Sequence, residues 1–290
     1  EASASSATNA ATAASVPAGA PTSVGAGEAA PVLLDMERIR SGRAQAILTN
    51  SGNANAATGA EGYRNARAMS GFLSRRLGIP DDLVLVASTG VIGHRLPVRK
   101  IGAAMGRLIR GLRPDGIAAA EEAIMTTDRF PKVAMRKGRI GDRPVTLCGI
   151  AKGAGMIQPH MATMLSYVMT DAAIEGSALD AVFRQAVGES FNAISVDGCM
   201  STNDTAIILA NGRAGNPLIR RRSKSLAIFC EMLSGVLSEL SRSMVRDGEG
   251  ATKLIRITIE EARTAGDAKK IAYAVANSNP FKTACSGQDP

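Results

Sequence analysis

Hydrophobic residues recur along this chain in two alternating patterns, which are short apolar runs and longer stripes with helical spacing. Short apolar runs bounded by glycine or polar residues predict buried strands. Five segments fit this description: 46–50, 83–86, 145–150, 164–169 and 205–210. A sixth segment, 254–259, alternates apolar and polar residues and so predicts a strand with one buried face.

Apolar residues spaced three and four positions apart predict amphipathic helices between these strands. The stripes cover residues 66–77, 98–112, 179–186, 226–244 and 268–275. Gly78 follows the first stripe, where glycine suits a helix C-terminal cap. Pro97 precedes the second, where proline suits the first helical turn. Strands that alternate with helices predict an α/β fold.

The stretch between the strands at 145–150 and 164–169 has the most informative chemistry. It opens with Lys152 and a glycine-rich loop, and it ends with Thr163 at a loop-to-strand edge. A threonine hydroxyl is a weak nucleophile until a base removes its proton, and one solution uses the threonine's own α-amine after cleavage of the preceding bond. The small residue Ala162 suits such a cut. On the local residues alone, Thr163 is interpreted as a threonine at the start of a strand whose hydroxyl caps a loop.

The segment 152–165 resembles the sequence around the nucleophile of the ornithine acetyltransferase (glutamate N-acetyltransferase) family of arginine biosynthesis. Four further blocks resemble the family and occur in its order: 50–56, 87–93, 195–205 and 246–253. The resemblance extends over residues 29–289. Five ordered blocks are far more specific than a lone glycine motif.

This resemblance implies a layered α/β fold of the self-cleaving, N-terminal-nucleophile-like type. It implies self-cleavage between Ala162 and Thr163, followed by ping-pong transfer of an acetyl group from N-acetylornithine to glutamate through acetyl-Thr163. The family's oxyanion hole corresponds to Thr89 and Gly90, and its substrate contacts include Lys152, Glu249 and Thr163. No cofactor is implied, although some members also use acetyl-CoA as an acetyl donor. Family members assemble as two α and two β chains.

Two residues depart from the family pattern. Arg129 stands where a substrate-binding threonine is usual, and it could pair with a substrate carboxylate or fill the site. His160 stands where asparagine is usual, which invites a base role, although the α-amine of Thr163 already supplies a base. Polar residues at 197 and 201–204, together with the asparagines near 50–55, are interpreted as structural turns.

The resemblance divides the chain into three parts. Residues 1–28 contain almost no large apolar side chain, which predicts a disordered leader. Residues 29–162 correspond to the α chain, and residues 163–290 to a β chain truncated before the family's last substrate-binding groups. Two alternatives remain open: a related self-cleaving amidase or aminopeptidase with water as acceptor, and an inactive variant that only binds ligand.

Composition and charge argue against several other classes of function. The 290 residues carry a net charge of +8, but the basic cluster at 220–222 lacks interleaved aromatic residues and predicts a solvated loop or helix start, not a nucleic-acid site. No run is long enough to span a membrane. Four cysteines without a Cys-x-x-Cys pair, together with two histidines, argue against a metal site and for reduced thiols in the cytoplasm.

Overall fold

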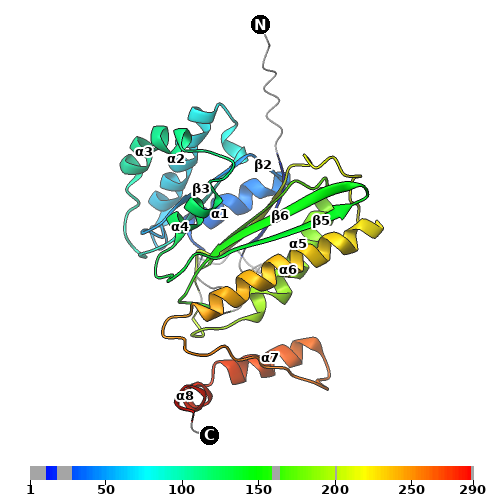
Figure 1. Ribbon diagram of the computed structural model, residues 1–290. Helices are drawn as coiled ribbons and strands as arrows, with labels where there is room; N and C mark the ends of the chain where they lie inside the picture. Colours follow the sequence, from blue (N-terminus) through cyan, green and yellow to red (C-terminus); the bar gives the residue numbers. More distant parts are fainter. Residues whose placement is uncertain (1–10, 18–27, 159–163, 200, 289–290) are drawn as a thin grey trace.

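The computed structural model describes residues 11–17, 28–158, 164–199 and 201–288 (Figure 1). The strands are β1 (Ala11–Pro17), β2 (Arg43–Ala44), β3 (Ala46–Asn50), β4 (Val84–Ser88), β5 (Val133–Ile140), β6 (Arg143–Lys152), β7 (Leu165–Thr170) and β8 (Thr205–Ala210). The α-helices are α1 (Ala30–Arg38), α2 (Gly59–Leu77), α3 (Val98–Arg110), α4 (Ile117–Ile124), α5 (Gly176–Glu189), α6 (Lys224–Arg246), α7 (Ala265–Ala276) and α8 (Asn279–Gly287).

The strands form two sheets. One has six strands in the order β2-β1-β8-β7-β6-β5, and the other is the parallel pair β3-β4. Within the larger sheet β7 and β8 are parallel, while the other neighbours are antiparallel. Lys152 at the end of β6 lies opposite Leu165 at the start of β7, and Leu165 lies opposite Thr205 of β8. The C-terminal end of β6 and the N-terminal ends of β7 and β8 therefore lie side by side at one end of the sheet.

Alternating side chains on β4 define the inner layers of the fold. Val84 and Val86 pack with α1, α2 and α3, whereas Leu85 and Ala87 pack against the six-stranded sheet. This is the expected result for a strand buried on both faces, because successive side chains point to opposite sides. The pair β3-β4 is therefore covered by helices on one face and by the larger sheet on the other (Figure 1).

Strand β7 shows the same alternation from the other side of the interface. Leu165 and Tyr167 face the two-stranded sheet, and Val168 packs in the cluster with α5 and α6. The hydroxyls of Tyr167 and Thr49 lie 2.8 Å apart and form a polar link between the two sheets. The molecule thus has four layers: helices, a small parallel sheet, a large mixed sheet, and helices.

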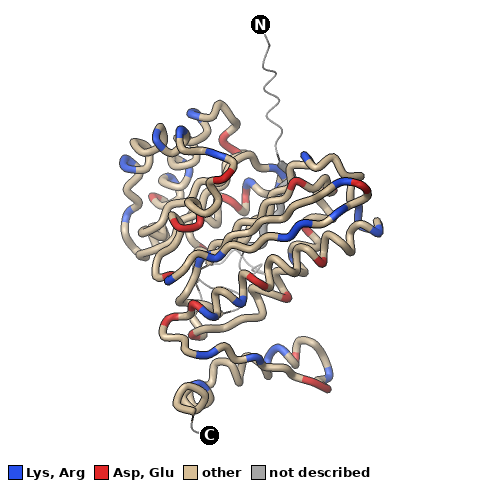
Figure 2. The backbone as a smooth tube through the Cα atoms, viewed as in Figure 1, with Lys and Arg blue, Asp and Glu red and all other residues tan. Residues whose placement is uncertain are grey.

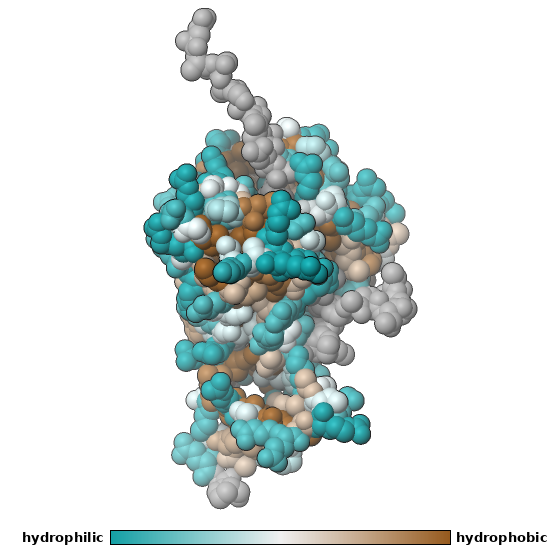
Figure 3. All heavy atoms as spheres, turned by 90° about the vertical axis from the view of Figure 1, so that its right-hand side faces the viewer, coloured by the Kyte–Doolittle hydropathy of each residue, from teal (hydrophilic) through white to brown (hydrophobic). Residues whose placement is uncertain are grey.

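The helices α7 and α8 form an arm that projects below the body (Figures 1 and 3). Neither helix has a buried residue. The arm is attached by polar contacts, including Tyr273 Oη to the carbonyl of Asn192 at 2.6 Å and Lys282 Nζ to the carbonyl of Val196 at 2.7 Å. Such contacts contribute little net stability because water competes for them.

The five continuous strand predictions and the five helix predictions are confirmed, with shifts of a few residues at their ends. The first helix, for example, begins at Gly59 and ends at Leu77, and Gly78 adopts a left-handed conformation with φ of 66°. The layered α/β fold class is likewise confirmed. The basic cluster at 220–222 is an exposed turn directly before α6, as expected.

Two predictions of local structure are wrong. The leader is not disordered throughout, because residues 11–17 form β1, which pairs with β8 from Thr12 to Pro17 and with β2 at its start. Backbone hydrogen bonds to β2 and β8 hold this segment in the sheet, although it lacks large apolar side chains. Residues 254–259, in contrast, form no strand, and Leu254 and Ile255 are exposed. A strand needs a neighbour, and no described strand pairs with this segment.

Basic and acidic residues are distributed over the helical layers, the sheets and the arm (Figure 2). None of the helices in the described part of the chain is long and apolar enough to cross a membrane. The four cysteines are free thiols. Among the described residues, no three His, Cys, Asp or Glu side chains gather in an arrangement that could hold a metal ion.

Candidate active site

Thr89 and Gly90 follow β4 directly, and Thr89 contacts Lys152 at the end of the large sheet where the ends of β6, β7 and β8 meet. Gly90 has φ of 129°, and a Cβ added to it would lie 2.3 Å from the carbonyl carbon of Gly52. Only glycine permits this approach of two backbone segments. The turn therefore places the backbone of Gly90 next to Thr89, which is buried.

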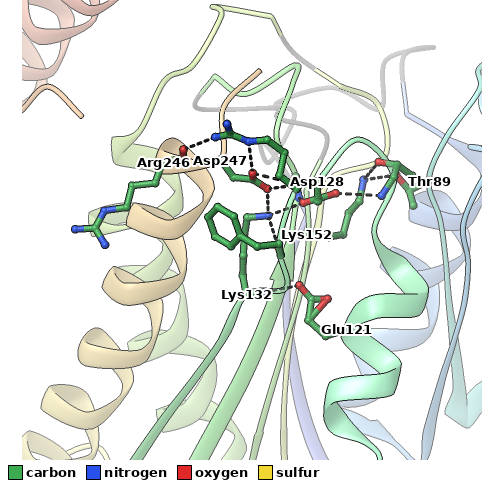
Figure 4. Close-up of polar contacts among 11 residues, drawn as sticks. Thr89, Glu121, Asp128, Lys132, Lys152, Arg246 and Asp247 are labelled. Atoms are coloured by element: carbon green, nitrogen blue, oxygen red, sulfur yellow. Dashed lines mark hydrogen bonds and ion pairs between the residues drawn. The ribbon is translucent and has the colours of Figure 1, made fainter. Parts of the chain in front are cut away.

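Lys152 extends from the end of β6 to this turn. Its Nζ donates to Thr89 Oγ1 at 2.8 Å and to Thr126 Oγ1 at 2.9 Å, and the residue is 1% exposed (Figure 4). Burial lowers the pKa of Lys152, while the negative charges of Asp128 and Asp204 oppose that shift. Because Thr89 Oγ1 accepts a hydrogen bond from the Lys152 ammonium, the hydroxyl proton of Thr89 remains free to be donated to another acceptor.

A second buried lysine organises the neighbouring loops. Lys132 Nζ lies 2.6 Å from Asp128 Oδ1 and 2.6 Å from Asp247 Oδ2, and all three side chains are fully buried (Figure 4). We call these three residues the Lys132 cluster. Asp128 Oδ1 also accepts the amide of Gly153 at 2.6 Å, so the cluster is connected to the residue that follows Lys152.

Hydrogen bonds and burial set the charges in the Lys132 cluster. Burial alone would raise the pKa of Asp128, but the hydrogen bonds from Lys132 and from the amides of Gly153 and Thr126 outweigh it and lower the pKa. Glu121 lies below, where its Oε1 accepts the Lys132 amide at 2.7 Å. Burial raises the pKa of Glu121, and its other oxygen has no partner within the described residues.

Arg129 contacts Asp247, and Glu249 contacts the glycine-rich loop. The Arg129 guanidinium contacts Asp247 Oδ1 at 3.1 Å and the carbonyl of Arg246 at 3.0 Å, with 57% of its side chain exposed. Glu249 is exposed, and its amide donates to the carbonyl of Ala154 at 3.0 Å. A Cβ on Gly155 would lie 2.7 Å from Glu249 Oε1, so the carboxylate rests against the glycine-rich loop.

The structure brings together most of the residues singled out in the sequence. Thr89, Gly90 and Lys152 share one end of the sheet, and Glu249 contacts the loop that begins at Lys152. Arg129 already pairs with a carboxylate of the protein itself. Ala162, Thr163 and His160 lie outside the described residues. His94 is exposed in a bend, as expected for a loop histidine.

The turn interpretation is confirmed for Asp197 and Asn50. Asp197 accepts backbone amides from Met156 at 2.5 Å, from Ile157 at 3.0 Å and from Cys199 at 2.9 Å. Asn50 similarly donates to the carbonyl of Asn53 at 2.8 Å. These side chains satisfy backbone groups in the loops beneath the site.

Sequence reasoning missed the Lys132 cluster and Thr126. In the sequence, Asp128, Lys132 and Asp247 resemble the charged residues of any solvated loop. One signal was available, because Asp128 and Lys132 are close in sequence to Arg129, and Asp247 lies with Glu249 in the block 246–253. Charged residues that gather in blocks of otherwise distinctive sequence are candidates for a buried network.

Comparison with known proteins decides the family. The profile of the ArgJ family matches residues 8–290. The chain belongs to the ArgJ family. It is 53% identical over 262 residues to the arginine biosynthesis bifunctional protein ArgJ of Geobacter sulfurreducens, which covers 90% of this chain and 67% of that protein. The ArgJ of Symbiobacterium thermophilum is 49% identical over 262 residues, covering 90% of this chain and 65% of its own length.

The chain thus spans about two thirds of the length of the ArgJ relatives that it matches. Two solved structures are also similar. The ArgJ of Bacillus halodurans is 37% identical, with a TM-score of 0.44 over 52% of this chain and 78% of that one. The ornithine acetyltransferase of Mycobacterium tuberculosis, solved with ornithine, is 30% identical, with a TM-score of 0.41 over 51% of this chain and 90% of that one.

Proposed function

We propose that this ArgJ chain transfers an acetyl group from N-acetylornithine to glutamate through an acetyl ester on Thr163, after cleaving its own chain between Ala162 and Thr163. One observation carries the proposal. Lys152 lies opposite Leu165 in the β6–β7 ladder, and its ammonium contacts the hydroxyl of Thr89. Leu165, which follows Thr163 by two positions in the sequence, therefore lies at the same end of the sheet as the Thr89–Gly90 turn.

The chemistry follows from these groups. The Thr163 Oγ attacks the acetyl carbonyl as its proton passes to the α-amine of Thr163. The carbonyl oxygen becomes an oxyanion, which accepts hydrogen bonds from the Thr89 hydroxyl and the Gly90 amide. The C–N bond then breaks, and the proton held by the α-amine passes to the departing amine of ornithine. The acetyl-threonine remains.

The second half-reaction reverses these steps with a different amine. The amine of glutamate attacks the acetyl ester, and the C–O bond to Thr163 breaks. The proton lost by the glutamate amine passes through the α-amine of Thr163 to the Thr163 oxygen. We assign Lys152 and Glu249 to the charged α-groups that ornithine and glutamate share, because the two side chains carry opposite charges on one loop system. The Arg129 side chain is 57% exposed, which leaves it able to meet a substrate carboxylate.

The same proposal includes the remaining family properties. Acetyl-CoA serves as a possible second acetyl donor, and no resident cofactor takes part in the transfer. The two pieces assemble in two copies each, in the cytoplasm. Gel filtration combined with light scattering of the cleaved protein tests the assembly.

The first test is the intact mass of the purified protein under denaturing conditions, beside the Thr163→Ala variant. We expect two fragments that divide between Ala162 and Thr163, and a single chain in the variant. An uncut wild-type chain would contradict the proposal at its first step, because Thr163 would then have no α-amine.

The second test follows the acetyl group from labelled N-acetylornithine. We expect label on Thr163 in the absence of glutamate and on glutamate when it is added. Release of free acetate at the same rate with or without glutamate would identify an amidase instead. Replacing Thr89 with valine should lower the rate of acetyl transfer about 100-fold, the usual effect of losing one oxyanion donor.

A further inference from the structure

The segment Asn203-Asp204-Thr205 lies between the two parts of the candidate site and contacts both. Its residues are buried, with 3% of Asn203, 2% of Asp204 and 6% of Thr205 exposed. Each makes contacts that a simple turn does not need. The segment has no role in the chemistry proposed above.

One set of contacts holds the residue at the start of β7. Asp204 Oδ1 accepts the amide of Met164 at 2.8 Å, and the amide of Thr205 donates to the carbonyl of Met164 at 3.1 Å. Both polar backbone groups of Met164 are therefore held by adjacent residues of one segment. The Met164 amide belongs to the peptide bond that joins it to Thr163.

The other set of contacts holds the Thr89–Gly90 turn. Asn203 Nδ2 donates to the carbonyl of Ser88 at 2.9 Å and to the carbonyl of Ala54 at 2.6 Å. Ser88 is the last residue of β4 and directly precedes Thr89. Its carbonyl belongs to the peptide bond that ends at the Thr89 amide.

We propose that Asn203 and Asp204 are positioning residues that fix the distance between the Thr89–Gly90 turn and the start of β7. This inference rests on the proposed function, since the nucleophile Thr163 directly precedes Met164. A newly cut chain end is ordinarily mobile. Holding both backbone groups of Met164 keeps the new N-terminus in register with the oxyanion donors, and a displacement of about 1 Å is enough to lower a rate about 100-fold.

Asp35 provides a matched control. It is also a buried aspartate, 4% exposed, and its Oδ1 accepts one backbone amide, that of Val86, at 2.9 Å. Burial raises the pKa of both carboxyls well above the ordinary value of 3.8. Val86 lies within the β3–β4 ladder opposite Leu48, so the ladder holds it independently of Asp35. The two aspartates differ in what they hold in place.

The experiment compares Asp204→Ala, Asp204→Asn, Asn203→Ala and Asp35→Ala with the wild-type chain. Intact mass over time after synthesis gives the rate of self-cleavage, and the melting temperature reports folding. We expect Asp204→Ala and Asn203→Ala to slow cleavage about 100-fold. Asp204→Asn keeps an oxygen that accepts the Met164 amide and should recover most of the rate. Asp35→Ala should cleave at the wild-type rate despite its lower melting temperature.

Equal cleavage in Asp204→Ala and wild type would overturn the inference. So would an Asp204→Asn variant that folds but cleaves as slowly as Asp204→Ala, because the carboxyl would then act by charge or proton transfer. Hydrogen exchange at the Met164 amide gives a readout that does not require cleavage. Exchange should accelerate in Asp204→Ala, and unchanged exchange would refute the positioning role. An uncut wild-type chain with fast Met164 exchange only in the variant would reject the proposed function and keep the inference.

Discussion

Two buried cationic side chains, Arg38 and Lys132, form ion pairs in different parts of the molecule. The two sets of ion pairs differ in how deeply the acidic partners are buried. Arg38 of α1 pairs with Asp81 at 2.5 Å, but 37% of the Asp81 side chain is exposed. Lys132 pairs with Asp128 and Asp247, both at 2.6 Å, and none of these three side chains is exposed. The Arg38 pair joins elements of one helical layer, whereas the Lys132 cluster joins two distant loops at the candidate site.

The comparison shows that similar ion pairs differ in what depends on them. A pair with an exposed partner can be replaced in part by water, so its loss leaves a hydrated carboxylate. Removing Lys132 leaves two buried carboxylates without their shared cation, and the only ion pair that remains to them among the described residues is that between Arg129 and Asp247. We therefore expect the Lys132 cluster to be the more costly of the two to disrupt.

Replacing Lys132 with methionine should have the largest effect. Breaking a buried ion pair typically lowers the free energy of unfolding by about 3–5 kcal/mol. Urea unfolding of Lys132→Met beside wild type measures the change. Because two carboxylates are stranded, the double variant Lys132→Met/Asp247→Asn should recover part of the loss. A single variant as stable as wild type would contradict the view that the cluster is essential.

The corresponding change in the other half, Arg38→Met, should have a smaller effect. Arg38 also donates to Ser70 Oγ at 3.0 Å and to the carbonyl of Val84, so its loss removes several charged hydrogen bonds. We expect a loss of about 1.5–3 kcal/mol, measured by the same urea unfolding. Self-cleavage should persist in this variant. A larger loss than in Lys132→Met would reverse the comparison.

Acid pH should weaken the Lys132 cluster selectively. The pKa of Asp128 is lowered from the ordinary 3.8, because hydrogen bonds from Lys132 and two backbone amides outweigh the effect of burial. A lowered pKa stabilises the fold above the pKa of the unfolded chain, and this contribution is lost as pH falls through the folded value. The stability difference between wild type and Asp128→Asn should therefore shrink below pH 3.8. A difference independent of pH would contradict this assignment.

The smallest effect should come from Arg129→Thr, which introduces the threonine that the family resemblance led us to expect at this position. The Arg129 side chain is 57% exposed, so its pair with Asp247 contributes about 1 kcal/mol or less. Unfolding measurements should show little change. The Michaelis constant for glutamate is the informative quantity: an increase would indicate that Arg129 meets a substrate carboxylate, and a decrease that it obstructs the site.

The main elements of the fold could be predicted because each carries its own pattern. The buried strands appear in the sequence as short continuous apolar runs, and the amphipathic helices appear as apolar stripes with a period of 3.6 residues. Strand β5 was missed because it lies at the sheet edge and carries Arg136, Lys137 and Arg139, which obscure the alternation. Residues 11–17 were missed for the opposite reason, since their pairing comes from neighbours and not from their own side chains.

The candidate site could be predicted only where local sequence limits the chemistry. Gly90 and Lys152 were found because a glycine turn after a strand and a lysine before a glycine-rich loop belong to recognisable blocks. The burial of Lys132 could not be inferred, because it depends on Asp247, which lies 115 positions away. Asp204 was interpreted as part of a turn, since nothing in its neighbourhood shows that its carboxyl reaches Met164. Partners distant in sequence are invisible to local pattern.

The order of strands in the large sheet has a consequence for any cut before Thr163. Strands β7 and β8 would belong to the second fragment, yet they lie between β1 on one side and β6 on the other, both from the first. The first fragment then supplies two separated parts of the large sheet, β2-β1 and β6-β5, and the second supplies the β8-β7 pair between them. Each fragment would contribute strands that pair with strands of the other fragment. The two fragments would therefore copurify in native buffer. Folding must also precede cutting, because fragments made separately would each lack the neighbours that their strands require.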